Sequence, residues 1–289
     1  MKLLSYIVLF FTLSCYSQDK SSIQFIENKG QFSKLIDYKL SIKNGDLFFS
    51  KNKITFNLYN KSKIYDLRHK KDNNGSNLIS GHVYNVEFIN ANKKTIKGLD
   101  TNSNYNNYFL GNDKSKWASG VKIFKRIYYS SLYNNIDLTY YEHFGKLKYD
   151  FIVHPNGKTK DIKLQYNGAD KIKIVKNHLY IYTSMGKVIE QSPYAYQIIN
   201  NKKTKVNCKY VLNNNILSFK FPKGYNENLD LIIDPILIFA TYTGSVADNW
   251  GYTATFDDLG NMYVGGTAFA IGYPTTKIGR AHVWTPVTS

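Results

Sequence analysis

The feature that most constrains this chain is a repeated alternation of apolar and polar residues in short segments, each closed by a tight turn. Residues 53–59 place Ile54, Phe56 and Leu58 between polar neighbours, and residues 83–89 alternate in the same way. Turn residues recur roughly every 8 to 12 positions, a spacing typical of antiparallel all-β domains. Because strand side chains alternate between two faces, the pattern predicts a β-sandwich-like domain.

Asparagine and glycine occupy the expected turns. Asn44-Gly45-Asp46 is predicted to join strands at 39–42 and 47–50, and Phe144-Gly145 to join 138–141 and 148–153. Both residue types accept the left-handed backbone that tight hairpins need. Further strands are expected at 162–166, 172–175, 179–183, 187–191, 195–199, 208–212 and 217–221. Residues 61–80 are expected to form a polar loop, and residues 100–119 an irregular zone packed on the sheets.

Residues 239–276 have a different organisation. Strand-like residues 250–256 and 262–266 flank the turn Asp257-Asp258-Leu259-Gly260-Asn261, which predicts one hairpin of a β-propeller blade. Asp257, Gly260 and Asn261 are structural turn residues in this interpretation, and calcium binding by the turn oxygens is the alternative. A blade needs neighbours to bury its faces, so we expect residues 235–276 to be the first, truncated blade of a propeller.

Residues 277–289 continue no strand pattern. The string from Ile278 to Ser289 looks like a sequencing adapter translated in one frame. An ordinary C-terminal tail is the alternative. We expect residues 277–289 to be non-native, and no function is assigned to them.

The N-terminus predicts export. Lys2 precedes an apolar run at residues 3–13, which has the length of a signal-peptide core, and cleavage is expected after residue 17. Processing as a lipoprotein at Cys15 is the alternative. The later sequence contains no apolar stretch of about 20 residues, so we expect no transmembrane segment in the mature chain.

Cysteine content and charge limit the disulfides and the binding partners that this chain can have. Once Cys15 is removed, Cys208 cannot form an internal disulfide, and its strand-like context predicts a buried thiol. The formal charge is +17, yet only three of the 38 basic residues are arginine, the residue that bidentate phosphate and base recognition favours. We therefore expect solvated lysines and no specific nucleic-acid binding, with attraction to acidic polysaccharide or lipid headgroups as the alternative.

No residue set predicts catalysis, a cofactor or a metal. Asp150 and His154 are four residues apart, which separates them by about 13 Å along one strand, too far for a catalytic pair. The histidines lack metal-binding spacing. The candidates for ligand binding are aromatic: Tyr105, Tyr108, Phe109 and Trp117 form one group, and Tyr128, Tyr129 and Tyr133 a second. Either group could stack on sugars, although core packing is the competing explanation.

Four phrases in order carry a family resemblance: FIENKGQ from Phe25, YNNYFLGND from Tyr105, KYDFIVHP from Lys148 and LIIDP from Leu231. They resemble an uncharacterised β-rich domain of exported Bacteroidetes proteins that precedes SBBP-type β-propeller repeats. The resemblance implies large surface or secreted proteins, many associated with type IX secretion and gliding motility. It implies a domain of unknown function at residues 18–234, without catalytic residues to transfer.

Together these features predict an exported structural or adhesion protein, at the cell surface or secreted, without catalytic activity of its own. Its expected partners are surface polysaccharide or other cell-surface proteins. A glycan-binding module is one alternative. The non-catalytic N-terminal part of a secreted polysaccharide- or protein-degrading enzyme is the other. Phe25 and Ile26 are expected to be buried, with Gly30 turning the chain behind them.

Overall fold

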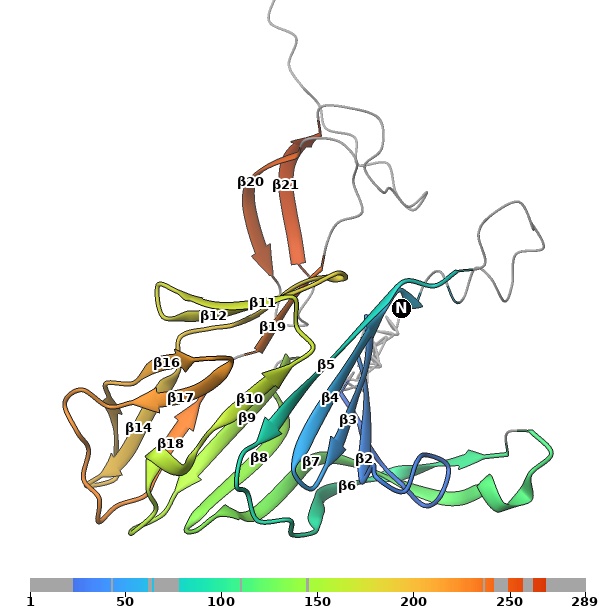
Figure 1. Ribbon diagram of the computed structural model, residues 1–289, viewed down its shortest axis with the longest axis horizontal. Helices are drawn as coiled ribbons and strands as arrows, with labels where there is room; N and C mark the ends of the chain where they lie inside the picture. Colours follow the sequence, from blue (N-terminus) through green and yellow to red (C-terminus); the bar gives the residue numbers. More distant parts are fainter. Residues whose placement is uncertain are drawn as a thin grey trace, which may run out of the picture.

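The computed structural model describes residues 23–42, 44–61, 64, 78–109, 111–143, 146–235, 237–241, 249–256 and 262–268, the last three ranges as backbone only. Antiparallel strands dominate these residues (Figure 1), and the 3₁₀ helices η1 (Lys114–Lys116) and η2 (Thr159–Asp161) are short. The all-β prediction is therefore confirmed. The described residues contain no helix with the length and apolarity needed to cross a membrane.

Fifteen strands of the described chain form one continuous antiparallel sheet. Along this sheet the order is β15-β14-β18-β9-β8-β7-β1-β2-β3-β4-β5-β10-β17-β16, and β6 pairs with β7 outside that path. The strands are β1 (Phe25–Glu27), β2 (Tyr38–Ile42), β3 (Gly45–Ser50), β4 (Lys53–Tyr59), β5 (Gly81–Phe88), β6 (Ile96–Tyr108), β7 (Ala118–Tyr133), β8 (Ile136–His143), β9 (Lys146–Val153), β10 (Leu164–Asn167), β14 (Tyr194–Ile199), β15 (Lys202–Val206), β16 (Lys209–Asn213), β17 (Ile216–Lys220) and β18 (Leu231–Asp234).

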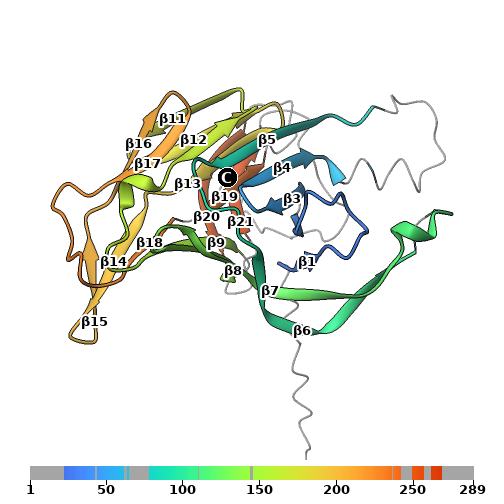
Figure 2. The same cartoon turned by 60° about the horizontal axis from the view of Figure 1, so that its bottom comes forward.

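This sheet folds over on itself to make two layers (Figures 1 and 2). Phe49 of β3 packs on Tyr140 of β8 with ring centroids 5.3 Å apart, although β7, β1 and β2 separate these strands along the sheet. Phe151 of β9 likewise meets Phe219 of β17 at 6.0 Å. The sandwich-like core is therefore enclosed by one folded sheet. Its two end strands, β15 and β16, are consecutive in the chain.

Asparagine pairs make two of the hairpin turns, and asparagine is one of the two residue types expected at turns. Asn200-Asn201 and Asn214-Asn215 all have positive φ, between 45° and 64°. Two consecutive left-handed residues are the geometry that matches the twist of paired strands. Gly45 has a φ of 147°, and a Cβ there would lie 2.1 Å from the carbonyl oxygen of Asn57. Glycine at this position lets β3 approach β4.

A second, four-stranded sheet lies at one end of the sandwich (Figure 1). It contains β11 (Lys171–Val175), β12 (His178–Thr183), β13 (Gly186–Glu190) and β19 (Leu237–Thr241), in that order. Leu179 and Ile181 of β12 are fully buried and belong to the same apolar cluster as the sandwich. The small sheet thus closes the end of the core.

A buried carboxylate joins the small sheet to the sandwich. Glu190 of β13 is only 4% exposed and accepts hydrogen bonds from the hydroxyls of three tyrosines. The donor–acceptor distances are 2.7 Å for Tyr166, 2.9 Å for Tyr149 and 3.5 Å for Tyr210. These tyrosines lie on β10, β9 and β16. Burial raises the pKa of Glu190 above its usual value, while the three hydroxyls oppose that shift.

The hairpin expected near the C-terminus is present. β20 (Asn249–Phe256) pairs with β21 (Met262–Ala268) in antiparallel register, with an irregularity near Gly251. The turn residues Asp257, Gly260 and Asn261 lie outside the described residues. So do residues 1–22, residues 269–289, most of the expected loop at 61–80, and the expected turn at 144–145.

One prediction about local structure is wrong. Residues 100–119 were expected to be irregular, yet β6 runs to Tyr108 and β7 starts at Ala118. The polar run from Thr101 to Asn107 is a poor strand sequence. It pairs with β7 through a ladder that shifts register between Thr101 and Tyr105 and again between Asn106 and Tyr108. Such bulges accommodate extra residues in one strand while pairing continues around them.

Candidate functional site

The distal part of the β6–β7 hairpin projects beyond the sandwich (Figures 1 and 2). Strand β7 pairs with β8 from Arg126 onward and with β1 at Ile123 and Phe124. From Ala118 to Lys122 its pairing partner is β6. We call the described residues 101–109 and 111–122 the arm. Ala118 and Val121 are buried on one side of this hairpin, whereas Tyr105, Phe109 and Trp117 are exposed and available to a partner.

The arm is held at its base by the end of β1 and the segment that follows it. The carboxylate oxygen Oε1 of Glu27 accepts a hydrogen bond from the backbone N–H of Lys122 at 2.8 Å. The ammonium of Lys29 donates to the carbonyl oxygen of Ser119 at 3.1 Å. Phe32 packs edge-on against Tyr108, with ring centroids 5.8 Å apart. These contacts orient the arm relative to the sandwich.

Asn28 organises this anchoring segment. Its Oδ1 accepts hydrogen bonds from the backbone N–H groups of Gly30 and Phe32, and its Nδ2 donates to the carbonyl oxygens of Ser33 and Ile36. Gly30 has a φ of 112°, as its predicted turning role requires. The FIENKGQ phrase is therefore structural in the described fold, and Phe25 within it is fully buried.

A short helical turn shapes the tip of the arm. Asp113 caps η1, and its Oδ1 accepts from the backbone N–H of Ser115 at 3.1 Å and from its hydroxyl at 2.7 Å. Lys116 lies 3.4 Å from the other carboxylate oxygen. The hydrogen bonds from Ser115 lower the pKa of Asp113, so the carboxylate is ionised at neutral pH.

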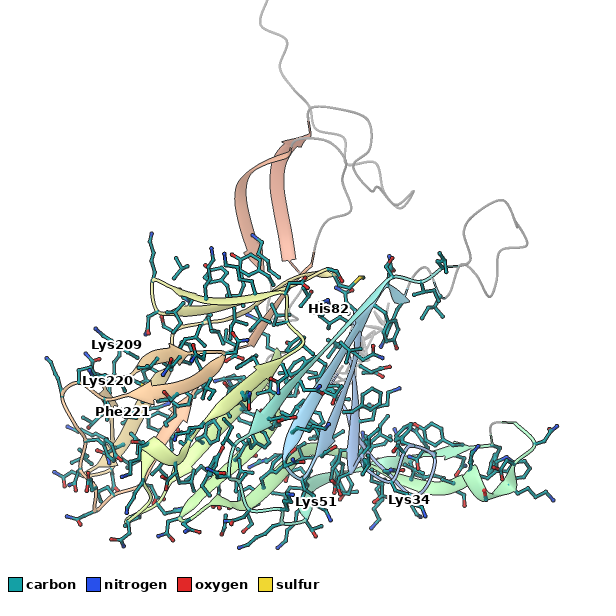
Figure 3. The ribbon with its side chains drawn as sticks, viewed as in Figure 1. Lys34, Lys51, His82, Lys209, Lys220 and Phe221 are labelled. Atoms are coloured by element: carbon teal, nitrogen blue, oxygen red, sulfur yellow. The ribbon has the colours of Figure 1, made fainter. Side chains whose placement is uncertain are left out.

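Aromatic side chains are exposed on the arm. Tyr105 is 63% exposed, Phe109 58% and Trp117 37%. Phe109 and Trp117 pack edge-to-face at 5.5 Å, and the indole N–H of Trp117 donates to the carbonyl oxygen of Gly111 at 3.2 Å. The ammonium of Lys114 lies 5.8 Å from the Trp117 ring centroid. The tip thus presents a fixed apolar surface beside positive charge. Figure 3 draws the side chains of the projecting hairpin as sticks along both of its strands.

The sequence named Tyr105, Tyr108 and Trp117 as possible ligand-binding residues, and all three lie on the arm. Tyr105 and Trp117 are exposed, whereas Tyr108 is half-buried against Phe32. The structure therefore separates Tyr108, which anchors the arm, from the aromatic residues that a partner could reach.

The second aromatic group is not a sugar platform, and that interpretation is wrong. Tyr129 and Tyr133 are each 3% exposed and belong to the core. The hydroxyl of Tyr133 donates to the carbonyl oxygen of Lys163 at 3.2 Å. Tyr128 of β7 is half-buried and donates to the carboxylate of Asp137.

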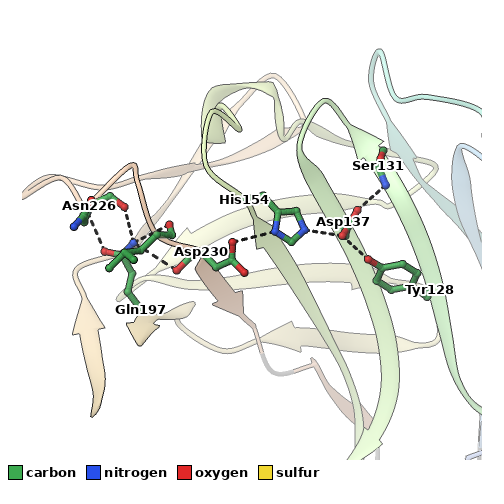
Figure 4. Close-up of polar contacts among 8 residues, drawn as sticks. Tyr128, Ser131, Asp137, His154, Gln197, Asn226 and Asp230 are labelled. Carbon is green, nitrogen blue, oxygen red and sulfur yellow. Dashed lines mark hydrogen bonds and ion pairs between the residues drawn. The ribbon is translucent and has the colours of Figure 1, made fainter. Parts of the chain in front are cut away.

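A second polar site is centred on His154, which lies between two carboxylates (Figure 4). Its Nε2 is 2.7 Å from Oδ2 of Asp137, and its Nδ1 is 3.0 Å from Oδ1 of Asp230. The hydrogen bond to Asp137 is the main cause that raises the pKa of His154. Asp137 also accepts from the backbone N–H of Ser131 at 2.6 Å. Burial alone would raise the pKa of Asp137, but its hydrogen bonds from Tyr128 and His154 lower it.

The His154 site fastens a loop to the sandwich. Asp230 is the last residue of the segment that leads into β18. Gln197 of β14 holds the same segment at Asn226. The Gln197 side chain donates to the carbonyl oxygen of Asn226 at 2.7 Å and accepts from the N–H of Asn226 at 2.9 Å. Asp150, the residue that sequence reasoning compared with His154, instead accepts from the hydroxyl of Tyr141 at 3.1 Å. The prediction that these two residues do not form a pair is confirmed.

The sequence did not identify Asp137 and Asp230 as partners of His154. One signal was available for Asp137, because it faces Ile152 across the β8–β9 hairpin and is therefore close to His154. Asp230 lies 76 positions from His154 in the chain, and no local pattern connects them. Their contact depends on β18 pairing with β9.

Another charged cluster lies where β18 ends. The ammonium of Lys148 is 2.7 Å from Oδ1 and 2.8 Å from Oδ2 of Asp234. Burial, followed by the charge of Asp234, raises the pKa of Asp150 to about 6. The charges of Lys148 and Lys203 oppose this rise, and the ion pair between Lys148 and Asp234 ties the end of β18 to β9.

The remaining chemistry of the described residues is limited. They contain no group of three or more histidine, cysteine or acidic residues placed to hold a metal ion. Cys208 is buried, as predicted, its thiol is free of a disulfide, and burial raises the thiol pKa to about 12. Cys208 also contributes to the wall of an open hollow of about 590 Å³ next to Lys205, Lys209 and Lys223.

Comparison with known proteins gives one match. A family model described as Domain of unknown function (DUF7948) matches residues 25–236. That range includes the folded sheet, the arm and three strands of the small sheet. Neither the curated proteins nor the solved structures yield a match.

Proposed function

We propose that this chain, which belongs to the DUF7948 family of domains of unknown function, is an exported protein of the cell surface that adheres to a partner through its arm. On this proposal it has no catalytic activity of its own. The observation that carries the proposal is the arm itself. It is anchored at its base and presents Phe109 and Trp117 away from the sandwich. Exposed aromatic residues on a preorganised support are typical of binding surfaces.

The charged clusters support a binding role over a catalytic one. His154 has both ring nitrogens engaged by carboxylates, so neither nitrogen is available to a substrate in this arrangement. Asp234 forms an ion pair with Lys148 at a strand end, and Asp150 lies in the field of Lys148 and Lys203. Each cluster has a structural explanation in the packing of β18 and the loop before it.

The wider setting is also proposed. Residues 1–17 direct export, and the β20–β21 hairpin belongs to the first SBBP-type repeat of a β-propeller. The motif resemblance points to a surface or secreted protein of Bacteroidetes-type bacteria, associated with type IX secretion or gliding motility. In this arrangement the DUF7948 domain would present the arm, and the propeller would serve as a scaffold.

The test is adhesion of the purified, fluorescently labelled chain to intact bacterial cells of this type and to the polysaccharide and protein fractions of their surface. Phe109→Ser with Trp117→Ser should weaken binding by more than about tenfold, because interface aromatics dominate binding energy. Val211→Ser is the matched control, since Val211 is 39% exposed and lies on β16, away from the arm. Equal binding by the arm variant and the control would contradict the proposal.

Glycan binding is the second candidate function, and the composition of the arm favours it. Exposed side chains with amide or hydroxyl groups surround the aromatic residues, among them Asn104, Asn107, Asn112 and Ser119. Such groups can exchange hydrogen bonds with sugar hydroxyls, while an aromatic ring covers the apolar face of a sugar. Binding to the polysaccharide fraction, and not to the protein fraction, would select this candidate.

A further inference from the structure

We infer that the arm binds a polysaccharide that carries carboxylate or sulfate groups, an inference that rests on the proposed adhesion through the arm. The first observation is charge. Within residues 101–122 the charged side chains are Lys114, Lys116, Lys122 and Asp113, a net charge of 3 − 1 = +2. The carboxylate of Asp113 is already occupied by Ser115 and Lys116. The arm therefore attracts anions.

The second observation is where the positive charge lies. Lys114 is next to the exposed indole of Trp117, with 5.8 Å between the ammonium and the ring centroid. A ligand that fills this site needs an apolar face for the ring and an anionic group for the ammonium. An acidic sugar has both on one pyranose ring. A neutral sugar would cover the ring but make no ionic contact with Lys114.

The third observation distinguishes polysaccharide from lipid. Insertion into a bilayer would remove water from the exposed polar side chains around the aromatic residues, including Ser103, Asn104 and Asn107. Burying unpaired amides and hydroxyls in hydrocarbon costs several kcal/mol. A hydrated polysaccharide offers hydroxyls that can pair with these groups instead. The polar composition of the arm thus favours a sugar chain as the ligand.

The fourth observation is order. Trp117 is fixed by its hydrogen bond to Gly111 and by its contact with Phe109, and the arm is fixed at its base by Glu27 and Phe32. Less conformational entropy is lost on binding when the contacting groups are already ordered. The site is therefore prepared for a long, repetitive ligand that contacts it through a few sugar units.

The test compares two forms of one polymer. Polygalacturonate carries a carboxylate on each sugar, and its fully methyl-esterified form has the same backbone without the charge. We expect the purified chain to bind polygalacturonate at least about tenfold more tightly than the ester at low salt, with the preference shrinking as salt screens the charges. Isothermal titration in a salt series measures this.

Matched lysine variants distinguish binding by the arm lysines from attraction to the positive charge of the whole chain. Lys114→Gln with Lys116→Gln should weaken binding to polygalacturonate by about tenfold. Lys209→Gln with Lys220→Gln removes the same charge from a cross-strand pair on β16 and β17 and should change binding less than about twofold. Equal losses in both double variants would overturn the inference, because they would indicate attraction to the net charge alone.

The remaining outcomes separate the two proposals. Binding to both polymers with equal affinity, if it depends on the arm, would agree with the proposed adhesion. It would contradict the inference that the ligand is an acidic polysaccharide. Binding to vesicles of phosphatidylglycerol in place of either polymer would replace the sugar ligand with a membrane. Arm-independent binding, or no binding to polymers, vesicles and cells, would overturn both the inference and the proposed function.

Discussion

Two regions of this protein are rich in aromatic side chains and use them in opposite ways. In the core, Tyr149, Tyr166 and Tyr210 are buried, and each hydroxyl donates to Glu190. On the arm, Phe109 and Trp117 pack on each other and remain partly exposed to solvent. The residue types are similar, but the surroundings differ. Buried tyrosine hydroxyls need an acceptor, and here a single carboxylate serves all three.

The comparison teaches that aromatic content alone does not reveal a binding surface. A tyrosine that supplies a hydroxyl to a buried carboxylate contributes to stability. An aromatic residue on a projecting hairpin contributes little to the core and is available to a partner. Mutations in the two regions should therefore separate stability from binding, which the following predictions test.

The largest effect is expected at the centre of the core cluster. Glu190→Ala leaves the hydroxyls of Tyr149 and Tyr166 without their acceptor and should lower the free energy of unfolding by about 3 kcal/mol. Glu190→Gln keeps an acceptor oxygen and should cost less. Urea denaturation followed by tyrosine fluorescence measures both. A loss below about 1 kcal/mol for the alanine variant would show that the cluster does not stabilise the core.

A smaller effect is expected at the junction of the two regions. Phe32→Ala removes the edge-on contact with Tyr108 and should cost about 1 kcal/mol of stability. Hydrogen exchange should accelerate at the arm residues and remain slow in β8 and β9. Uniform acceleration across the sandwich would contradict the assignment of Phe32 as an anchor of the arm.

The His154 site should give the fold a dependence on pH. A raised folded-state pKa means that the native protein holds its proton more tightly, so this stabilisation is present below the unfolded value of about 6.5. It is lost as pH rises through the folded value. Because the His154 side chain is 38% exposed, solvent screening limits the effect to at most about 1 kcal/mol.

The measurement is the free energy of unfolding at pH 6.5 and at pH 8.5. The unsubstituted chain should be less stable at the higher pH, and His154→Gln should reduce that difference. Asp150 has a folded pKa of about 6, so most of its titration takes place below this pH range and contributes little to the difference. An unchanged pH dependence in the variant would exclude His154 as its source.

The smallest effect on stability is expected at the tip of the arm. Trp117→Ala should change the free energy of unfolding by less than about 0.5 kcal/mol, because the partly exposed ring makes its contacts, to Phe109 and to the carbonyl oxygen of Gly111, within the arm and away from the core. Its effect on binding should be large by comparison. Thermal denaturation of the variant checks this. A substantial loss of stability would remove the distinction between the arm and the core.

Local patterns predicted much of the fold. Alternating segments predicted most strands, and asparagine pairs predicted turns that the structure confirms, including Asn200-Asn201. These predictions succeed because strand alternation and left-handed turns depend on residues close together in the chain. The polar run from Thr101 to Asn107 misled the prediction, since its pairing with β7 overrides weak strand propensity.

The candidate sites were less accessible to sequence reasoning. The sequence identified Tyr105, Tyr108 and Trp117 as a group, but it could not separate the anchoring Tyr108 from its exposed neighbours. It also offered Tyr128, Tyr129 and Tyr133 as an equal alternative, although Tyr129 and Tyr133 are buried. Exposure depends on what packs against a strand, and those partners come from distant parts of the chain.

By itself, the sequence determined that this is an all-β chain with hairpins closed by asparagine and glycine, since period-two alternation and positive φ are local properties. Only the tertiary structure decided that one sheet folds over to enclose the core and that Glu190 meets three tyrosines. It also decided that His154 lies between Asp137 and Asp230, and that the arm leaves the sheet. These features require strands far apart in sequence to pair or face one another, and no short-range pattern encodes which strands will meet.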